Sequence, residues 1–410
     1  MYYPLKTFYP PGERELFVNR EQELRRMEFI LEEVITKKGS KENIAILGLR
    51  RTGKTMLIKE FIRRNHTKSI PIYLNVQRMM GEPADFSLHF ILTTLFWAYH
   101  KDSEEKYLAR TALLNQKLYN PDLHPLLESI FNEYEKRNPE YQVLIEYCFV
   151  LLREIAVLEN RPVPVFLDEF QDIMHLNRFK GIGNVLAIFR EHLNDENVVF
   201  CISGSAVRMM ENILNNTDSP IFAQLSKIYI RYLEKEASKE LVGKIADFDN
   251  VTADLIYRYT SGHPEYIRHI TSRLKEKTVL LDVKPSRMLL KEVLVEEVLG
   301  AGGRINDLCN YLYSNSLERA RYKAPLKSVL RILSNDPYLT QSQIAKLLGK
   351  SQGEARNYLL ALEEIDLVAK EDGKYFIIDP LIGLWISGKE FGIERLTFPK
   401  KVTERYIKHL

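Results

Sequence analysis

The chain has 410 residues, of which 45% are hydrophobic and 28% are charged, so it is long enough for two or three domains with proper cores. Its net charge of +3 gives no overall argument for nucleic acid as a partner, although local basic patches stay open. Three widely spaced cysteines argue against a disulfide framework, and the absence of a signal-peptide layout or of an apolar run near the ~20 residues of a membrane span predicts a cytoplasmic protein.

The N-terminal region predicts an arm followed by a helix. Residues 1–16 are rich in Tyr and Pro and are expected to lie across the surface as an extended arm. In the FVNREQEL stretch, residues 17–24, Asn19 is placed to cap a helix whose apolar residues recur at helical spacing up to Val34. A helix that carries both acidic and basic residues is by default a solvated structural element.

An apolar run meets a glycine-containing loop in residues 44–60, IAILGLRRTGKTMLIKE. A loop that wraps a phosphate chain must point its backbone N–H groups inward, and Gly48 and Gly53 permit the dihedral angles that this requires. Lys54 can reach the outer phosphates as a point charge, and Thr55 offers a hydroxyl to Mg²⁺. With a strand before it and a helix after it, the GxxxxGK[ST] spacing predicts a nucleotide site.

The candidate nucleotide contacts in this stretch are Gly48, Arg50, Arg51, Thr52, Gly53, Lys54, Thr55 and Met56. The spacing leaves open whether Arg50 or Arg51 contacts the nucleotide. Arg20 lies close to this loop in the sequence, and this leaves room for a role beside the nucleotide base.

A second strand is predicted at residues 70–76, and a helical insertion at about 80–160 follows it. Its helices are expected at residues 86–99, 123–134 and 141–158. Packing against the sheet is the favoured role of the insertion. The alternative is a partner surface that includes Phe96 and Trp97.

Two adjacent carboxylates follow the next predicted strand. The apolar run at residues 162–167, PVPVFL, ends in Asp168 and Glu169. An acidic turn after a core strand would explain the pair by itself. With a phosphate-binding loop upstream, we instead expect Asp168 to hold Mg²⁺ and Glu169 to polarise the water that attacks the γ-phosphate of ATP.

A further strand at residues 198–202 leads into Ser203-Gly204-Ser205. In P-loop ATPases with an added strand between the two motifs, a polar residue at this place senses the γ-phosphate or the attacking water, so Ser203 and Ser205 are catalytic candidates. The alternative for either serine is a helix cap. A last strand at residues 227–232 closes the sheet, and strands that alternate with helices predict an α/β protein with a doubly wound parallel sheet.

Short helices are predicted from residue 234 to about residue 281, broken at residues 261–264, SGHP, where Gly and Pro force a turn. His263 and Arg268 have ordinary explanations as a loop residue and a solvated helix charge. The functional alternative places one of them, with His263 the candidate contact, over the phosphates from a helical lid.

The C-terminal third predicts a winged helix. Three helices are expected at residues 325–333, 340–348 and 351–365, and a hairpin follows at residues 367–378. The third helix could present to a DNA major groove the side chains of Ser351, Gln352, Arg356, Asn357 and Tyr358. Acidic residues that oppose DNA contact are Glu354, Glu363, Glu364, Glu371 and Asp372. DNA binding and a protein-contact role are therefore both kept.

The domains that follow are an ATPase core at residues 1–233, a helical lid at 234–323, a winged helix at 324–390 and a basic tail at 391–410. The tail is expected to be solvated, or else to contact phosphate or a partner.

The stretches FVNREQEL, GLRRTGKT, VPVFLDEFQ, ISGS, SGHP and IIDPLIGLWI together resemble the archaeal ATPase family, relatives of the STAND and AAA-type P-loop NTPases. The resemblance covers roughly residues 17–385. It implies a five-stranded P-loop NTPase core with strand order 5-1-4-3-2, a helical lid, and ATP with Mg²⁺ as ligands. By position it assigns phosphate and Mg²⁺ binding to the loop, Mg²⁺ binding to Asp168 and the role of catalytic base to Glu169.

One departure from the resemblance concerns an arginine. Similar proteins tend to follow the sensor segment with a Pro-apolar-aromatic-Gly-Arg run, where this chain has residues 220–224, PIFAQ. If that arginine assists hydrolysis, Gln224 implies slow turnover or another donor, such as Arg208 or Arg231.

Three functions follow from the sequence. The first is an ATP-driven switch that reports to duplex DNA or protein through the winged helix. The second is a nucleic-acid-binding module with little ATP turnover, and the third is a scaffold that binds a protein partner or a second copy through the insertion.

Overall fold

A computed structural model of the chain describes residues 7–37, 41–99, 113, 115, 118–318, 320 and 322–390. The chain forms two compact units, residues 1–230 and 231–410. The predicted basic tail lies outside the described residues, and the separation of residues 234–323 from 324–390 into two domains stays a prediction.

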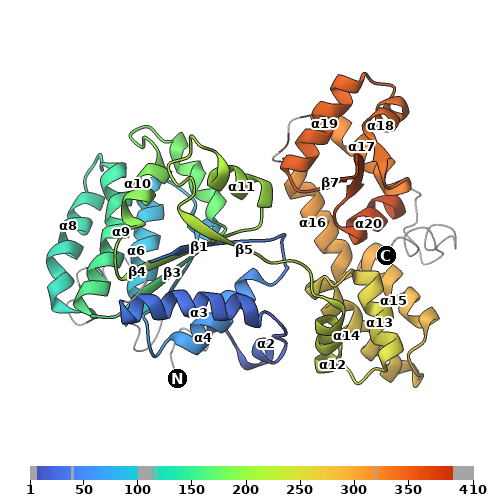
Figure 1. The fold of residues 1–410 in the computed structure, drawn as a ribbon, viewed down its shortest axis with the longest axis horizontal. Helices are drawn as coiled ribbons and strands as arrows, with labels where there is room; N and C mark the ends of the chain where they lie inside the picture. Colours follow the sequence, from blue (N-terminus) through green and yellow to red (C-terminus); the bar gives the residue numbers. More distant parts are fainter. Residues whose placement is uncertain are drawn as a thin grey trace. The chain divides into compact units, whose positions relative to one another are not determined.

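The first unit is built on a parallel five-stranded sheet with the order β2-β3-β4-β1-β5 (Figure 1). Its strands are β1 (Asn43–Leu47), β2 (Ile72–Asn75), β3 (Val163–Asp168), β4 (Val198–Gly204) and β5 (Leu225–Tyr229). This confirms the order 5-1-4-3-2. The strands β1, β3 and β4 are buried along their whole length, which explains why they read as continuous apolar runs rather than as alternating ones.

Helices cover both faces of this sheet (Figure 1). The helical elements of the unit are α2 (Pro11–Glu15), α3 (Glu21–Thr36), α4 (Lys54–Asn65), α5 (Val76–Met79), α6 (Pro83–Tyr99), η2 (Pro121–Leu123), α8 (His124–Tyr134), α9 (Tyr141–Leu158), η3 (Phe170–Arg178), α10 (Val185–His192) and α11 (Val207–Asn215). Phe166 pairs in register with Cys201, the residue after Phe200, so the two phenylalanines point to opposite faces. Phe61 of α4 packs on Phe166, whereas Phe189 of α10 packs on Phe200.

The insertion helices belong to the core. Phe96 and Trp97 of α6 are 5% and 4% exposed, and Phe149 of α9 is fully buried. The alternative that Phe96 and Trp97 present a partner surface is therefore wrong for these side chains, because the fold has already covered them.

Two predictions about the N-terminal region need correction. Part of the expected extended arm is the short helix α2, in which Pro11 occupies the first turn, where its missing N–H costs nothing. The N-cap position of α3 is held by Arg20 rather than Asn19, without a side-chain cap hydrogen bond, and both residues have a left-handed backbone conformation.

The second unit is mainly helical. Its helices are α12 (Lys235–Ile245), α13 (Asn250–Thr260), α14 (Pro264–Leu281), α15 (Arg287–Leu299), α16 (Arg304–Glu318), α17 (Lys323–Asn335), α18 (Gln341–Leu348), α19 (Gln352–Glu364) and α20 (Pro380–Glu390). A three-stranded antiparallel sheet is ordered β6-β8-β7, with β6 (Leu339–Thr340), β7 (Val368–Glu371) and β8 (Lys374–Ile377). The helices α17, α18 and α19 with this sheet form the predicted winged helix.

Local sequence explains where the winged-helix elements begin. Thr340 and Ser351 each form a capping box, with Gln343 and Glu354 as the reciprocal partners. Gly373 has a positive φ in the turn between β7 and β8. In the part of the chain that the structure describes, no helix is long and apolar enough to cross a membrane.

Candidate functional site

The loop between β1 and α4 is the first component of the site. Gly48 lies so close to Ile230 that an added Cβ would stand 2.4 Å from the Ile230 carbonyl oxygen, so only glycine fits there. Gly53, with φ of +100°, is the residue from which α4 begins. Thr52 is buried and donates a hydrogen bond to the Leu49 carbonyl at 2.9 Å, which fixes the width of the loop.

Lys54 lies folded under this loop. Its Nζ donates to the carbonyl oxygens of Gly48 at 2.7 Å and of Leu49 at 2.8 Å. Burial lowers the pKa of Lys54 to about 8, although the charges of Glu169 and Asp168 act in the opposite direction. The loop thus holds one buried cation on its own backbone.

Asp168, the last residue of β3, is the centre of the site. Its Oδ2 accepts hydrogen bonds from Thr55 Oγ1 at 2.9 Å and from the Tyr73 hydroxyl at 2.8 Å. Its Oδ1 accepts from Ser203 Oγ at 2.6 Å and from the Glu169 N–H at 3.1 Å. Side chains from α4, β2 and β4, three segments distant from Asp168 in the sequence, therefore converge on one carboxylate that is 3% exposed.

Glu169 stands beside this carboxylate in a left-handed conformation, with φ of +54°. Its Oε2 accepts from Ser205 Oγ at 2.6 Å and from Gln171 Nε2 at 2.7 Å. Burial by itself would raise the pKa of Glu169, but these two hydrogen bonds and the charges of Lys54 and Arg50 outweigh it and lower the pKa. Glu169 is therefore an ionised carboxylate at neutral pH, the form that a general base needs.

The two serines have distinct partners. Ser203 is fully buried against Asp168, and Ser205 holds Glu169. The alternative of a helix cap is wrong for both, because α11 is preceded by Ala206 without a side-chain cap.

Arg20, the residue before α3, contacts the loop. Its side chain is almost fully buried, and its Nη2 donates to the Thr52 carbonyl at 3.5 Å while Nη1 lies 3.4 Å from Glu23. Met56 is half-buried and packs against the core from the first turn of α4. Arg50 is half-buried and Arg51 is exposed, the latter with a positive φ.

His263 belongs to the second unit, where it serves as the cap of α14. It is 2% exposed, its Nδ1 accepts from the Tyr266 N–H at 3.5 Å, and its ring stacks on Tyr266 at 3.9 Å. The preceding Gly262 has a positive φ and lies where a Cβ would come within 2.0 Å of the Leu233 carbonyl. These contacts account for the SGHP turn, while a role of His263 at a nucleotide stays a prediction.

The structure also shows the segment in which Gln224 replaces the arginine of similar proteins, and the two alternative arginines. Gln224 is exposed, and Ala223 before it has φ of +56°, a conformation that favours glycine. Arg208 lies exposed on α11, and Arg231 is the first residue of the second unit.

Two residues of the site were missed from the sequence. Tyr73 lies two residues before Asn75, which pairs in register with Asp168, so strand alternation puts Tyr73 on the same face as that carboxylate. Gln171 follows Glu169 by two residues in η3, and its Oε1 is buried without a hydrogen-bond partner among the described residues. Tyr73 could have been identified only from the pairing of β2 with β3.

The oxygen donors are of the kind that hard divalent cations such as Mg²⁺ take. No group of three or more His, Cys, Asp or Glu side chains is arranged as a metal cage within the described ranges. Thr55 and Asp168 instead offer two adjacent hard oxygens, which is the small protein share that Mg²⁺ takes when phosphate oxygens and water complete its shell.

Comparison with known proteins is consistent with this geometry. The sequence profile of an ATPase domain predominantly from Archaea matches residues 17–270, and a winged helix-turn-helix DNA-binding profile matches residues 326–369. No curated protein matches the sequence.

Two solved structures share the fold. The Walker-type ATPase PABY2304 of Pyrococcus abyssi superposes with a TM-score of 0.64 at 17% identity, covering 92% of this chain and 97% of that one. The ORC2 protein of Aeropyrum pernix, solved in ADPNP-ADP complexes, gives a TM-score of 0.55 at 12% identity, covering 95% and 94%. The ATPase profile matches residues 17–270, which is more than half of the 410-residue chain. The chain therefore belongs to the family of ATPase domains found predominantly in Archaea.

Proposed function

We propose that the chain binds ATP with Mg²⁺ in the loop of residues 48–55 and hydrolyses its γ-phosphate bond. The observation that carries this proposal is that Thr55 donates to Asp168, that Glu169 stands beside Asp168, and that the charge of Lys54 acts on both carboxylates. Phosphoryl transfer to water requires three kinds of group: a cation that binds phosphate, oxygen ligands for Mg²⁺, and a base for the attacking water. Lys54, the Thr55–Asp168 pair and the ionised Glu169 are groups of these kinds.

Each residue has a part in this mechanism. Lys54 would leave the Gly48 and Leu49 carbonyls to pair with the outer phosphates, while the N-terminal end of α4 favours the same negative charge. Bound Mg²⁺ would supply neutralisation of the phosphate charge, held by Thr55 and Asp168. Glu169, oriented by Ser205 and Gln171, would accept the proton of the attacking water.

The decisive variant is Glu169→Gln. It keeps the shape of the side chain and removes its basicity, so ATP should bind nearly as in the wild type while phosphate release falls by about 10²- to 10⁴-fold. The control is Glu191→Gln, which changes an exposed carboxylate on α10. Normal phosphate release by purified Glu169→Gln would refute the assignment of the base.

DNA binding by the winged helix is a second candidate function. It is supported by the match of residues 326–369 and by the exposure of Gln352, Arg356 and Asn357 on α19. Glu354 should repel DNA phosphates less than the sequence indicates. It caps the helix through Ser351 and pairs with Lys350 at 3.2 Å, so its charge is partly neutralised.

Salt dependence tests this second function. Arg356→Ala should weaken duplex DNA binding and lower the slope of log affinity against log salt by about one, since one phosphate contact is lost. The same measurement on Lys327→Ala, an exposed cation on α17, serves as the control. Equal effects of the two variants would indicate nonspecific charge attraction rather than contact by α19.

A further inference from the structure

The Tyr73 hydroxyl shares one oxygen of Asp168 with Thr55. A threonine hydroxyl has one proton and two lone pairs, so Thr55 can donate to Asp168 Oδ2 and still offer a lone pair to a metal ion. Tyr73 donates its one proton to the same Oδ2 at 2.8 Å, and it lies in β2 rather than in the loop. Its effect is to fix the direction in which Oδ2 points.

The ring of Tyr73 is in turn held by two aromatic residues from other segments. Phe8, near the start of the described chain, packs at 4.4 Å between ring centroids, and Trp97 of α6 lies 6.3 Å away. Phe8 and Trp97 also contact each other edge to face at 5.2 Å. Tyr73 therefore stands between an N-terminal segment and the insertion.

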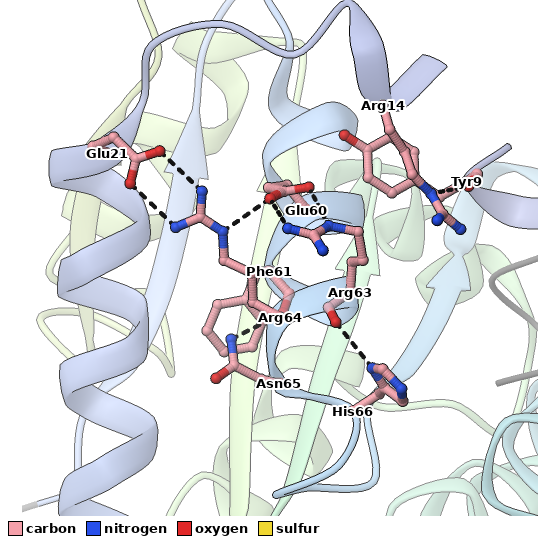
Figure 2. Close-up of polar contacts among 9 residues, drawn as sticks. All are labelled: Tyr9, Arg14, Glu21, Glu60, Phe61, Arg63, Arg64, Asn65 and His66. Carbon is pink, nitrogen blue, oxygen red and sulfur yellow. Dashed lines mark hydrogen bonds and ion pairs between the residues drawn. The ribbon is translucent and has the colours of Figure 1, made fainter. Parts of the chain in front are cut away.

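The N-terminal segment is anchored on the helix that begins at the loop. The Tyr9 side chain is fully buried, and Arg14 Nε donates to the Tyr9 carbonyl at 2.7 Å (Figure 2). Lys59 of α4 pairs with Glu13 at 2.6 Å and lies 5.0 Å from the centre of the Phe8 ring. This segment thus connects α4 with the tyrosine that orients Asp168.

We propose that Tyr73 is a positioning residue for Asp168 in Mg²⁺ binding, and that residues 7–16 hold Tyr73 in place through Phe8. This inference rests on the proposed function. It makes the metal requirement of the site depend on a segment that lies outside the phosphate-binding loop.

The test is ATP binding by calorimetry, titrated with Mg²⁺ from micromolar to millimolar and repeated in EDTA. Tyr73→Phe keeps the ring and removes the hydroxyl, so the Mg²⁺ concentration for half-maximal enhancement of ATP binding should rise about threefold to tenfold. ATP affinity in EDTA should stay unchanged. The matched control is Tyr99→Phe, which removes a tyrosine–carboxylate hydrogen bond of the same 2.8 Å length, to Glu159.

A double-variant comparison tests the part played by the N-terminal segment. Phe8→Ala should shift the Mg²⁺ requirement in the same direction, and the double variant with Tyr73→Phe should shift it no further than the larger single change. Phe8→Leu replaces Phe8→Ala if the latter unfolds. Independent, additive shifts would overturn the link between Phe8 and Tyr73.

The outcomes separate the two levels of the proposal. A wild-type Mg²⁺ requirement in Tyr73→Phe overturns the positioning role and leaves the proposed function standing. Absence of Mg²⁺-dependent ATP binding in the wild-type protein overturns the proposed function, and this inference with it.

Discussion

Lys54 carries its charge into a place where only 5% of the residue is exposed. Burial is the main cause of its low pKa of about 8, and Arg50 acts in the same direction, while Glu169 and Asp168 oppose it. A lysine whose folded pKa is depressed destabilises the fold while it is charged, below pH 8. From about pH 8 to its usual value of 10.5, the unfolded chain holds the proton that the folded chain has lost, so this contribution improves with rising pH.

ATP binding should depend on pH in the opposite direction to stability. Only the protonated amine attracts phosphate, so we expect ATP affinity to fall above pH 8, by up to tenfold per pH unit. Calorimetric titrations across this range check it, with Lys54→Ala expected to abolish binding. Lys54→Arg is the control for the slope, because its guanidinium stays charged throughout and whatever affinity it keeps should not fall in this way. A flat profile for the wild type would contradict a role for the Lys54 charge.

Sequence reasoning at this scale found the residues that a local pattern marks. Lys54 and Thr55 follow from the loop spacing, and Asp168 with Glu169 from the end of an apolar strand. Tyr73 could not be found in this way, because its role comes from the lateral pairing of two strands separated by the whole insertion. Arg20 was expected near a nucleotide base; the structure places its side chain against the Thr52 carbonyl and Glu23, and a role at the base stays a prediction.

Among the elements, α4 is tied to its surroundings by a buried carboxylate. Glu60 is 5% exposed and accepts hydrogen bonds from Arg63 and from Arg64, and Arg64 also makes two hydrogen bonds to Glu21 of α3 (Figure 2). Since α4 begins at Lys54, directly after the loop, a network that holds α4 against α3 also holds the loop end of α4 in position.

Removal of Glu60 should therefore destabilise the first unit. Glu60→Ala leaves two arginines facing each other without their shared partner, and we expect a loss of about 2–4 kcal/mol of unfolding free energy. Glu32→Ala, which removes an exposed pair with Lys68 at 3.8 Å, should cost less than about 1 kcal/mol. Urea unfolding of both variants makes the comparison. Similar losses would show that the Glu60 network adds no more than a surface ion pair.

Elements were easier to anticipate than their surfaces. The boundaries of α9 and of the winged-helix helices follow closely from apolar spacing and capping residues. In α6, apolar residues occur on nearly all sides of the helix, so the sequence does not show which side faces the core. Two roles were therefore left open for Phe96 and Trp97. The fold decided between them by burying both against the core.

The whole chain joins an ATPase unit to a unit that carries a winged helix. If hydrolysis drives a switch, occupancy of one unit must change the free energy of the other, and this coupling is reciprocal for binding. Duplex DNA should then increase phosphate release by the full-length protein. Arg356→Ala should lose the increase and keep the basal rate, whereas Lys327→Ala should keep both. A rate indifferent to DNA would favour a protein as the partner of the winged helix.

The order of the strands also has a consequence for synthesis of the chain. Ile44 of β1 pairs with Cys201 of β4 on one side and with Ser226 of β5 on the other. A chain that grows from its N-terminus therefore makes the apolar strand that leads into the loop long before either neighbour exists. Contacts of such separation form slowly and leave strand edges open to aggregation. One of the three strands that the finished protein buries along their whole length is thus the one that waits longest for its neighbours during synthesis.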